Sequence, residues 1–209
     1  HGETHAHRLE VTGAFTWNNG FVAGAGALWV HGATTVTVPT TITGEDTTDG
    51  RARGLGLLDS VEMRTTSTME ITEAELGGSH AARLVNEGTL TLAGADSRLA
   101  PCSSGACVLT NNVSSSIVVS AGVAFDAGWH VQNFGSLELE AAASLRLTHG
   151  ADLAQGELLV DANAELAFVG DSVSMTQIEM YELRVLADFP VVGELTNWTE
   201  AVVDEYGAV

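Results

Sequence analysis

The sequence comprises 209 residues with a formal net charge of −19, and its 8 basic residues are all arginine. A surface this acidic repels the phosphates of nucleic acids and of anionic membranes, so we expect no nucleic-acid partner. Hydrophobic residues make up 45% of the chain, which excludes wholesale disorder, and no apolar run is long enough to span a membrane. The 23 glycines and the frequent Thr, Ser and Val residues are typical of a β-rich chain with many turns.

Short segments in which apolar and polar residues alternate recur along the chain in pairs. The two members of each pair have the same offset: Leu28-x-Val30 with Val36-x-Val38, Val61-x-Met63 with Met69-x-Ile71, Leu137-x-Leu139 with Leu145-x-Leu147, and Leu158-x-Val160 with Leu166-x-Phe168. Alternation with a period of two predicts strands that bury one face, whereas a helix would place its apolar residues three and four apart.

Seven candidate repeat units follow from these segments, and their spacing shortens toward the C-terminus. The anchors are Leu28, Val61, Leu90, Ile117, Leu137, Leu158 and Ile178. The last three intervals between anchors are nearly equal, which indicates a basic period of about 20 residues. The first three intervals are longer, so we expect insertions at 39–54, 72–82 and 99–108. Loops that project from a rigid repeat stack are common places for binding residues, although surface extensions are also tolerated without a function.

An Asn-x-Gly motif precedes two of the anchors. Asn86-x-Gly88 and Asn133-x-Gly135 each lead into a leucine-rich strand. Glycine allows the backbone to bend into the strand, and asparagine hydrogen-bonds neighbouring backbone at a corner. If the units stack, these asparagines are expected to form a ladder.

This repeat pattern resembles that of the right-handed parallel β-helix family, which includes surface proteins, adhesins, phage tail proteins and polysaccharide-degrading enzymes. The resemblance implies an all-β fold, a single-stranded parallel β-helix of about seven coils in one domain over 1–209. We expect an N-terminal cap within 1–12 and a C-terminal cap within 190–209, the latter containing a short helix after Asn197. An antiparallel β-sandwich or jelly roll with alternating strands is the competing fold.

The two cysteines, Cys102 and Cys107, flank a short glycine-containing segment and are expected to form a local disulfide. Such a bond favours an oxidising compartment, so the predicted location is extracellular or at the cell surface. Asn112 and Asn197 begin N-x-Ser/Thr triplets, which are glycosylation sequons if the chain is secreted by a eukaryote.

Two segments are candidates for metal binding. Glu45, Asp46 and Asp49 place three carboxylates near a glycine turn and could hold Ca²⁺, although a solvated acidic loop has the same composition. His1, His5 and His7 could bind metals adventitiously. The start of the chain also resembles that of copper-dependent polysaccharide monooxygenases, but those enzymes use a sandwich fold. We expect no resident cofactor.

No catalytic constellation stands out, and the sequence leaves enzymatic activity open while favouring a non-enzymatic role. We expect a structural or adhesive module of a cell surface, fibre or secreted matrix. Its partners would be other copies or surface proteins at the solenoid ends, where strand edges are exposed. The alternative is a carbohydrate-active protein, either a polysaccharide-binding module or a lyase or hydrolase, using a groove beside the N-terminal insertion loops.

Overall fold

The structure, a computed structural model, describes residues 7–37, 55–58, 60–94, 97–103, 105–153, 155–161 and 163–168. Beyond these it describes the backbone of four further strands, at 173–175, 182–185, 191–192 and 200–203. Side chains are described as far as Ala167. These residues form strands and turns and no helix, so nothing in the described chain could span a membrane as a helix.

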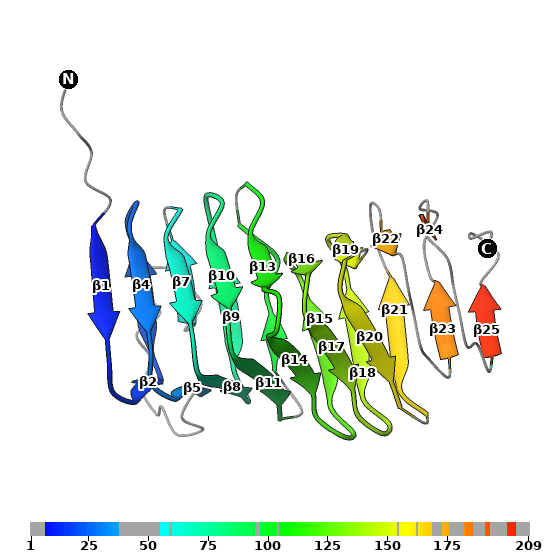
Figure 1. The fold of residues 1–209 in the computed structure, drawn as a ribbon. Helices are drawn as coiled ribbons and strands as arrows, with labels where there is room; N and C mark the ends of the chain where they lie inside the picture. Colours follow the sequence, from blue (N-terminus) through cyan, green and yellow to red (C-terminus); the bar gives the residue numbers. More distant parts are fainter. Residues whose placement is uncertain are drawn as a thin grey trace, which may run out of the picture.

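The strands belong to three parallel sheets that share one direction of stacking (Figure 1). Sheet A contains β1 (Arg8–Val11), β4 (Ala27–Val30), β7 (Glu62–Thr65), β10 (Arg83–Asn86), β13 (Val108–Asn111), β16 (His130–Asn133), β19 (Ala151–Leu153), β22 (Val173–Met175) and β24 (Val191–Val192). Sheet B contains β2 (Phe15–Trp17), β5 (Thr34–Thr37), β8 (Thr68–Thr72), β11 (Thr89–Ala93), β14 (Ser116–Val119), β17 (Ser136–Leu139) and β20 (Glu157–Val160).

Sheet C completes each coil. It contains β3 (Gly20–Ala23), β6 (Leu55–Leu58), β9 (Glu75–Gly78), β12 (Arg98–Leu99), β15 (Ala124–Ala127), β18 (Ser144–Leu147), β21 (Glu165–Phe168), β23 (Glu182–Val185) and β25 (Glu200–Val203). As far as β21, each strand pairs with the strand three places later in the chain, so three strands make one coil and seven complete coils are described. Beyond β21 the described strands that pair are two places apart. The predicted parallel β-solenoid is confirmed, and the antiparallel sandwich is wrong.

The core runs along the inside of the stack as columns of apolar side chains. In sheet A the inward column passes through Leu28, Met63, Leu84, Leu109 and Val131, none more than 4% exposed. Each coil covers the side chains of the coil before it, and burying each large aliphatic side chain contributes roughly 1.5–3 kcal/mol. The alternation seen in the sequence is therefore the alternation between this core and the outer faces.

The predicted anchors do not all lie on the same sheet. Leu28 lies in sheet A and Val61 directly precedes a strand of that sheet, whereas Leu90 and the later anchors up to Leu158 lie in sheet B. Ile178 is outside the described residues. The sequence analysis counted residues of two sheets as one series of anchors. An inward leucine gives the same period-two alternation on each of the three sheets, so the alternation does not tell the sheets apart.

In sheet B the true register joins Met69, Leu90, Ile117, Leu137 and Leu158. These steps are nearly equal except the one from Leu90 to Ile117, which is longer because it contains the insertion predicted at 99–108, between β12 and β13. The insertion predicted at 72–82 is wrong, because β9 lies there in ordinary register with its neighbours. The segment 39–54 falls outside the described residues.

Three buried asparagines stack at the corner between sheets A and B. Asn86 Nδ2 donates to Asn111 Oδ1 at 2.8 Å, and Asn111 Nδ2 donates to Asn133 Oδ1 at 2.7 Å. Each amide also donates to a carbonyl of the following coil, that of Ser116 or Ser136 for the first two. The predicted ladder is confirmed. Its middle member, Asn111, was missed because no glycine follows it at the second position.

The glycine of the Asn-x-Gly motif serves close approach between coils. A β-carbon at Gly88 would overlap the Ser67 carbonyl oxygen, and one at Gly135 would overlap that of Ser115. Neither glycine has a positive φ. Glycine was expected at these positions because it lets the backbone bend. The structure gives a different reason: the backbones of neighbouring coils are too close at this corner for a β-carbon.

Both ends of the stack differ from the expected caps. Residues 8–11 of the expected N-terminal cap form β1, the first strand of sheet A. The expected C-terminal helix is wrong over Glu200–Val203, which form β25 and pair with β23 in parallel. The edge of β23 offers backbone partners to a segment with two valines, and this outweighs the local helix-start pattern.

Candidate functional site

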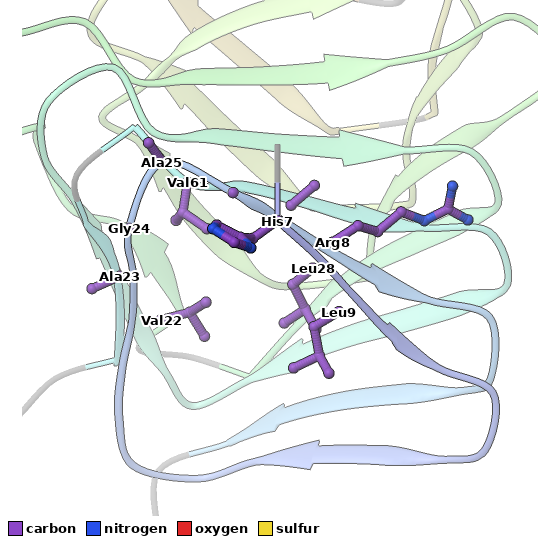
Figure 2. Close-up of a pocket in the computed structure, with 11 residues that line it drawn as sticks. His7, Arg8, Leu9, Val22, Ala23, Gly24, Ala25, Leu28 and Val61 are labelled. Atoms are coloured by element: carbon purple, nitrogen blue, oxygen red, sulfur yellow. The ribbon is translucent and has the colours of Figure 1, made fainter. Parts of the chain in front are cut away.

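Side chains of the first described coil are less covered than their counterparts in the second. Leu9 is in register with Leu28 on the inward side of sheet A, yet Leu9 is 64% exposed and Leu28 only 4%. A cavity of about 400 Å³ lies beside this coil, lined by residues of the first two coils and by Val61 (Figure 2). Phe21, on β3 of the same coil, is 47% exposed.

The outer face of sheet A carries a cluster of charged groups around Trp29. The guanidinium carbons of Arg8 and Arg64 lie 3.7 Å and 4.7 Å from the centroid of its ring, which is the geometry of cation–π contacts. Arg64 Nη2 lies 2.8 Å from Glu62 Oε1, and Nη1 binds Glu87 from the next coil. The cluster thus connects strands β1, β4 and β7 with the turn that follows β10.

The charged side chains of this cluster form ion pairs with one another. Burial lowers the pKa of Arg64, but the hydrogen bonds and charges of Glu62 and Glu87 outweigh it and raise the pKa above its ordinary value. Arg8 likewise pairs with Glu10 on its own strand. Carboxylates engaged in this way are poorly placed to act as general acids or bases, which need a free oxygen directed at a substrate.

A second row of charges crosses the outer face of sheet C. Backbone register places Glu75, Arg98, Asp126 and Arg146 side by side on four successive coils, with alternating sign. Arg98 Nε donates to Glu75 Oε2 at 2.9 Å, and this bond, aided by the charges of Glu75 and Asp126, raises the pKa of Arg98. The pair of Arg98 and Glu75 links two neighbouring coils.

The insertion between β12 and β13 is pinned to the stack. Cys102 and Cys107 form a disulfide with their Cα atoms 5.6 Å apart. Beneath it Trp129 is fully buried and donates from Nε1 to the Ala100 carbonyl at 2.9 Å. A β-carbon on Gly78 would lie 2.7 Å from the Trp129 ring, so this glycine makes room for the indole. Sequence reasoning found the cysteines but missed Trp129 and Gly78, which share no motif with them.

A polar groove of about 430 Å³ lies at the corner between sheets A and B in the fifth to seventh coils. It is lined by Ser114–Ser116, Phe134–Ser136 and Gln155–Glu157. Three successive coils therefore present hydroxyl, amide and carboxylate groups beside one aromatic ring. These are the groups that bind sugars through hydrogen bonds and stacking.

The remaining predicted site residues are placed as follows. Glu45, Asp46, Asp49, His1, His5 and Asn197 lie outside the described residues, so calcium binding at the acidic loop stays a prediction. His7 is exposed and lines the cavity beside the first coil. Asn112 donates from Nδ2 to Glu87 Oε1 at 3.1 Å. Over the part of the chain that the structure describes, no three His, Cys, Asp or Glu side chains gather in a way that could hold a metal.

Comparison of the chain with protein-family models, with curated proteins and with solved structures finds no match. The features that bear on function are therefore the fold, the paired charges on sheets A and C, and the polar groove at the corner between sheets A and B.

Proposed function

We propose that the chain is a rigid, non-catalytic structural or adhesive module of a cell surface, fibre or secreted matrix. The observation that carries this proposal is the pairing of outward charges between neighbouring coils. Arg64 joins two coils on sheet A, and Arg98 joins two on sheet C. Side chains that connect coils in this way stiffen the stack, whereas an active site would direct them toward a shared substrate.

The internal contacts of the stack support the same role. The core is continuous over the coils whose side chains are described, and the Asn86–Asn111–Asn133 ladder ties three of them together through buried hydrogen bonds. In a repeat protein each coil is stabilised by its neighbours, so a long uninterrupted stack resists local opening. A rod of this kind holds its two ends at a constant separation, which is useful in a fibre or a surface layer.

The extracellular setting is part of the proposal. The Cys102–Cys107 disulfide is of a type that persists in oxidising compartments. The net charge of −19 keeps such a protein soluble outside the cell.

The test is incubation of the purified chain with neutral and acidic polysaccharides, with and without Ca²⁺, measuring both retention and new chain ends. We expect no new chain ends from any polysaccharide. Cleavage would overturn the structural role if it were lost in the triple variant Glu45→Gln, Asp46→Asn, Asp49→Asn, which removes the predicted calcium ligands. Cleavage that survives in this variant would overturn the role as well and exclude the acidic loop as its site.

A second candidate function is polysaccharide binding without cleavage, favoured by the corner groove. Two coils present serine hydroxyls there, Phe134 adds a ring, and the third coil adds the amide of Gln155 and the carboxylate of Glu157. The carbohydrate-active alternative predicted from the sequence placed the binding groove beside the N-terminal insertion loops. The groove in the structure lies several coils away from them. Retention that disappears in Phe134→Ala/Gln155→Ala but persists in Val113→Ala would assign binding to the groove. Val113 is a suitable control because it is 77% exposed and does not line the groove.

A further inference from the structure

The disulfide of the insertion presents its two sulfur atoms very differently to solvent. Cys102 is partly exposed, whereas Cys107 is only 2% exposed. A β-carbon on Gly78 would lie 2.5 Å from Cys107 Sγ and 2.7 Å from the Trp129 ring, so the sulfur and the indole pack against the same point of the core. A reagent in solvent therefore reaches this disulfide from the side of Cys102.

Backbone hydrogen bonds hold Cys107 in place independently of the disulfide. The amide of the next residue, Val108, donates to the Ala82 carbonyl of the preceding coil at 3.0 Å. The His130 amide of the following coil donates to the Cys107 carbonyl, also at 3.0 Å. Cys107 is thus fixed between two coils, and we expect its side chain to stay in the core when the disulfide is opened.

The surroundings of Cys102 are small, exposed and uncharged. Its neighbours Pro101 and Ser103 are exposed, as is Gly105. No Asp, Glu, Lys or Arg occurs between residues 99 and 108, although the chain as a whole carries a net charge of −19. A small thiol, including an anionic one, therefore meets neither bulky side chains nor negative charge within the insertion itself.

Thiol–disulfide exchange depends on which of the two sulfurs an incoming thiolate can reach. The incoming sulfur bonds to one cysteine, the bond between the two cysteines breaks, and the other cysteine leaves with the electron pair as a thiolate. The step consumes no further oxidant or reductant. Attack at Cys107 is disfavoured, because the incoming thiolate would have to enter the core beside Trp129.

We propose that Cys102 is a site of reversible S-thiolation, where a low-molecular-weight thiol such as glutathione forms a mixed disulfide and Cys107 leaves as a buried thiol. The new bond joins the sulfur of the incoming thiol to Cys102 Sγ, and the Cys107 thiolate takes up a proton from water. The backbone keeps the two cysteines together, with Cα atoms 5.6 Å apart, so Cys107 can attack Cys102 in turn and expel the bound thiol. The inference goes beyond the proposed structural role and does not rest on it.

The first test locates the adduct on the unaltered chain. The chain is incubated with reduced glutathione at neutral pH, acid stops the exchange by protonating thiolates, and mass spectrometry of peptic peptides locates the bound glutathione. We expect the adduct on Cys102 to exceed that on Cys107 about tenfold or more. Equal amounts on the two cysteines, an excess on Cys107, or no adduct on either would overturn the inference.

The second test compares two variants that lack the disulfide equally. Cys107→Ala leaves the thiol of Cys102, and Cys102→Ala leaves that of Cys107. Each variant is treated with glutathione disulfide, and the rate of mixed-disulfide formation is followed by mass. We expect Cys102 to react about tenfold faster or more, because Cys107 is reached only when the core opens locally. In urea, where both thiols are exposed, the two rates should become similar.

Circular dichroism verifies that both variants are folded, so that a difference in rate reports access to the thiol. Equal rates in the folded variants, or a faster reaction of Cys107, would overturn the inference. A difference that persists unchanged in urea would do so as well, because the preference would then come from the local sequence. If either variant fails to fold, the first test decides. None of these outcomes affects the proposed structural role, which is tested by the cleavage of polysaccharides.

Discussion

The first coil and the middle coils have the same three-strand architecture but differ in how completely they are covered. In the inward column of sheet A, Leu9 is 64% exposed, whereas Leu84 and Leu109, three and four coils further on, are at most 2% exposed. The middle coils also contain the asparagine ladder. The difference shows that a solenoid strand gains most of its stability from the two coils that flank it.

Truncating equivalent leucines in the two regions tests whether coverage by neighbouring coils determines their contribution to stability. Leu84→Ala should lower the free energy of unfolding by about 2–5 kcal/mol, because it leaves a cavity between two coils. Leu9→Ala should cost less than about 1 kcal/mol in dilute solution, since its side chain is mostly in contact with water. Urea denaturation monitored by circular dichroism measures both. Equal costs for the two substitutions in dilute solution would contradict the view that coverage by neighbouring coils determines stability.

The second prediction concerns the close approach of coils at the A–B corner. Gly88→Ala places a methyl group against the Ser67 carbonyl and should destabilise the chain by about 1–3 kcal/mol, or more if the backbone cannot shift. Gly13 has no atom within 4 Å of the position of a β-carbon, so Gly13→Ala is the matched control from the first coil. Differential scanning calorimetry would measure both, and similar melting temperatures would argue against tight contact at this corner.

The third prediction concerns the ladder. Asn111→Ala removes the amide that lies between Asn86 and Asn133 and leaves their buried groups with fewer partners, at a cost of about 1–3 kcal/mol. Asn112→Ala, at the next position, loses one bond to Glu87 at the partly exposed face and should cost less than about 1 kcal/mol. Hydrogen exchange would show whether protection is lost in the three ladder coils first, and uniform loss over all coils would contradict a local role.

The smallest expected effect is that of the charge row on sheet C. Glu75→Gln should cost roughly 0.5 kcal/mol, because both partners are about half exposed and water and salt screen the pair. The pKa of Arg98 is raised, so the stability linked to this shift is fully present below the ordinary arginine pKa and lost only as pH rises through the higher folded value. Urea denaturation of the two proteins at low and high salt measures the difference, which should shrink as salt is added.

The sequence predicted the strands and the stacking well but not the assignment of strands to faces. Leu28 and Leu90 have the same alternating neighbours, yet one faces the core from sheet A and the other from sheet B. Asn111 joins the ladder although no glycine follows it, because what defines a ladder residue is its register with Asn86. Trp129 and Gly78 pack together under the disulfide loop although they are distant in the sequence. Contacts of this kind join residues that are far apart in the sequence, so local sequence patterns do not predict them.

Composition, period-two alternation and the recurrence of paired strand segments determined by themselves that this protein is acidic and built from short repeated strands, and they predicted the solenoid and the local disulfide that the structure shows. These are local or periodic properties, and each coil expresses them in its own residues. Only the tertiary structure decided which side chains meet across coils. It showed which glycines are required by the close approach of neighbouring coils and which charged side chains pair with each other. These features depend on the register between strands, which is set by the lengths of all the intervening turns together rather than by any one segment.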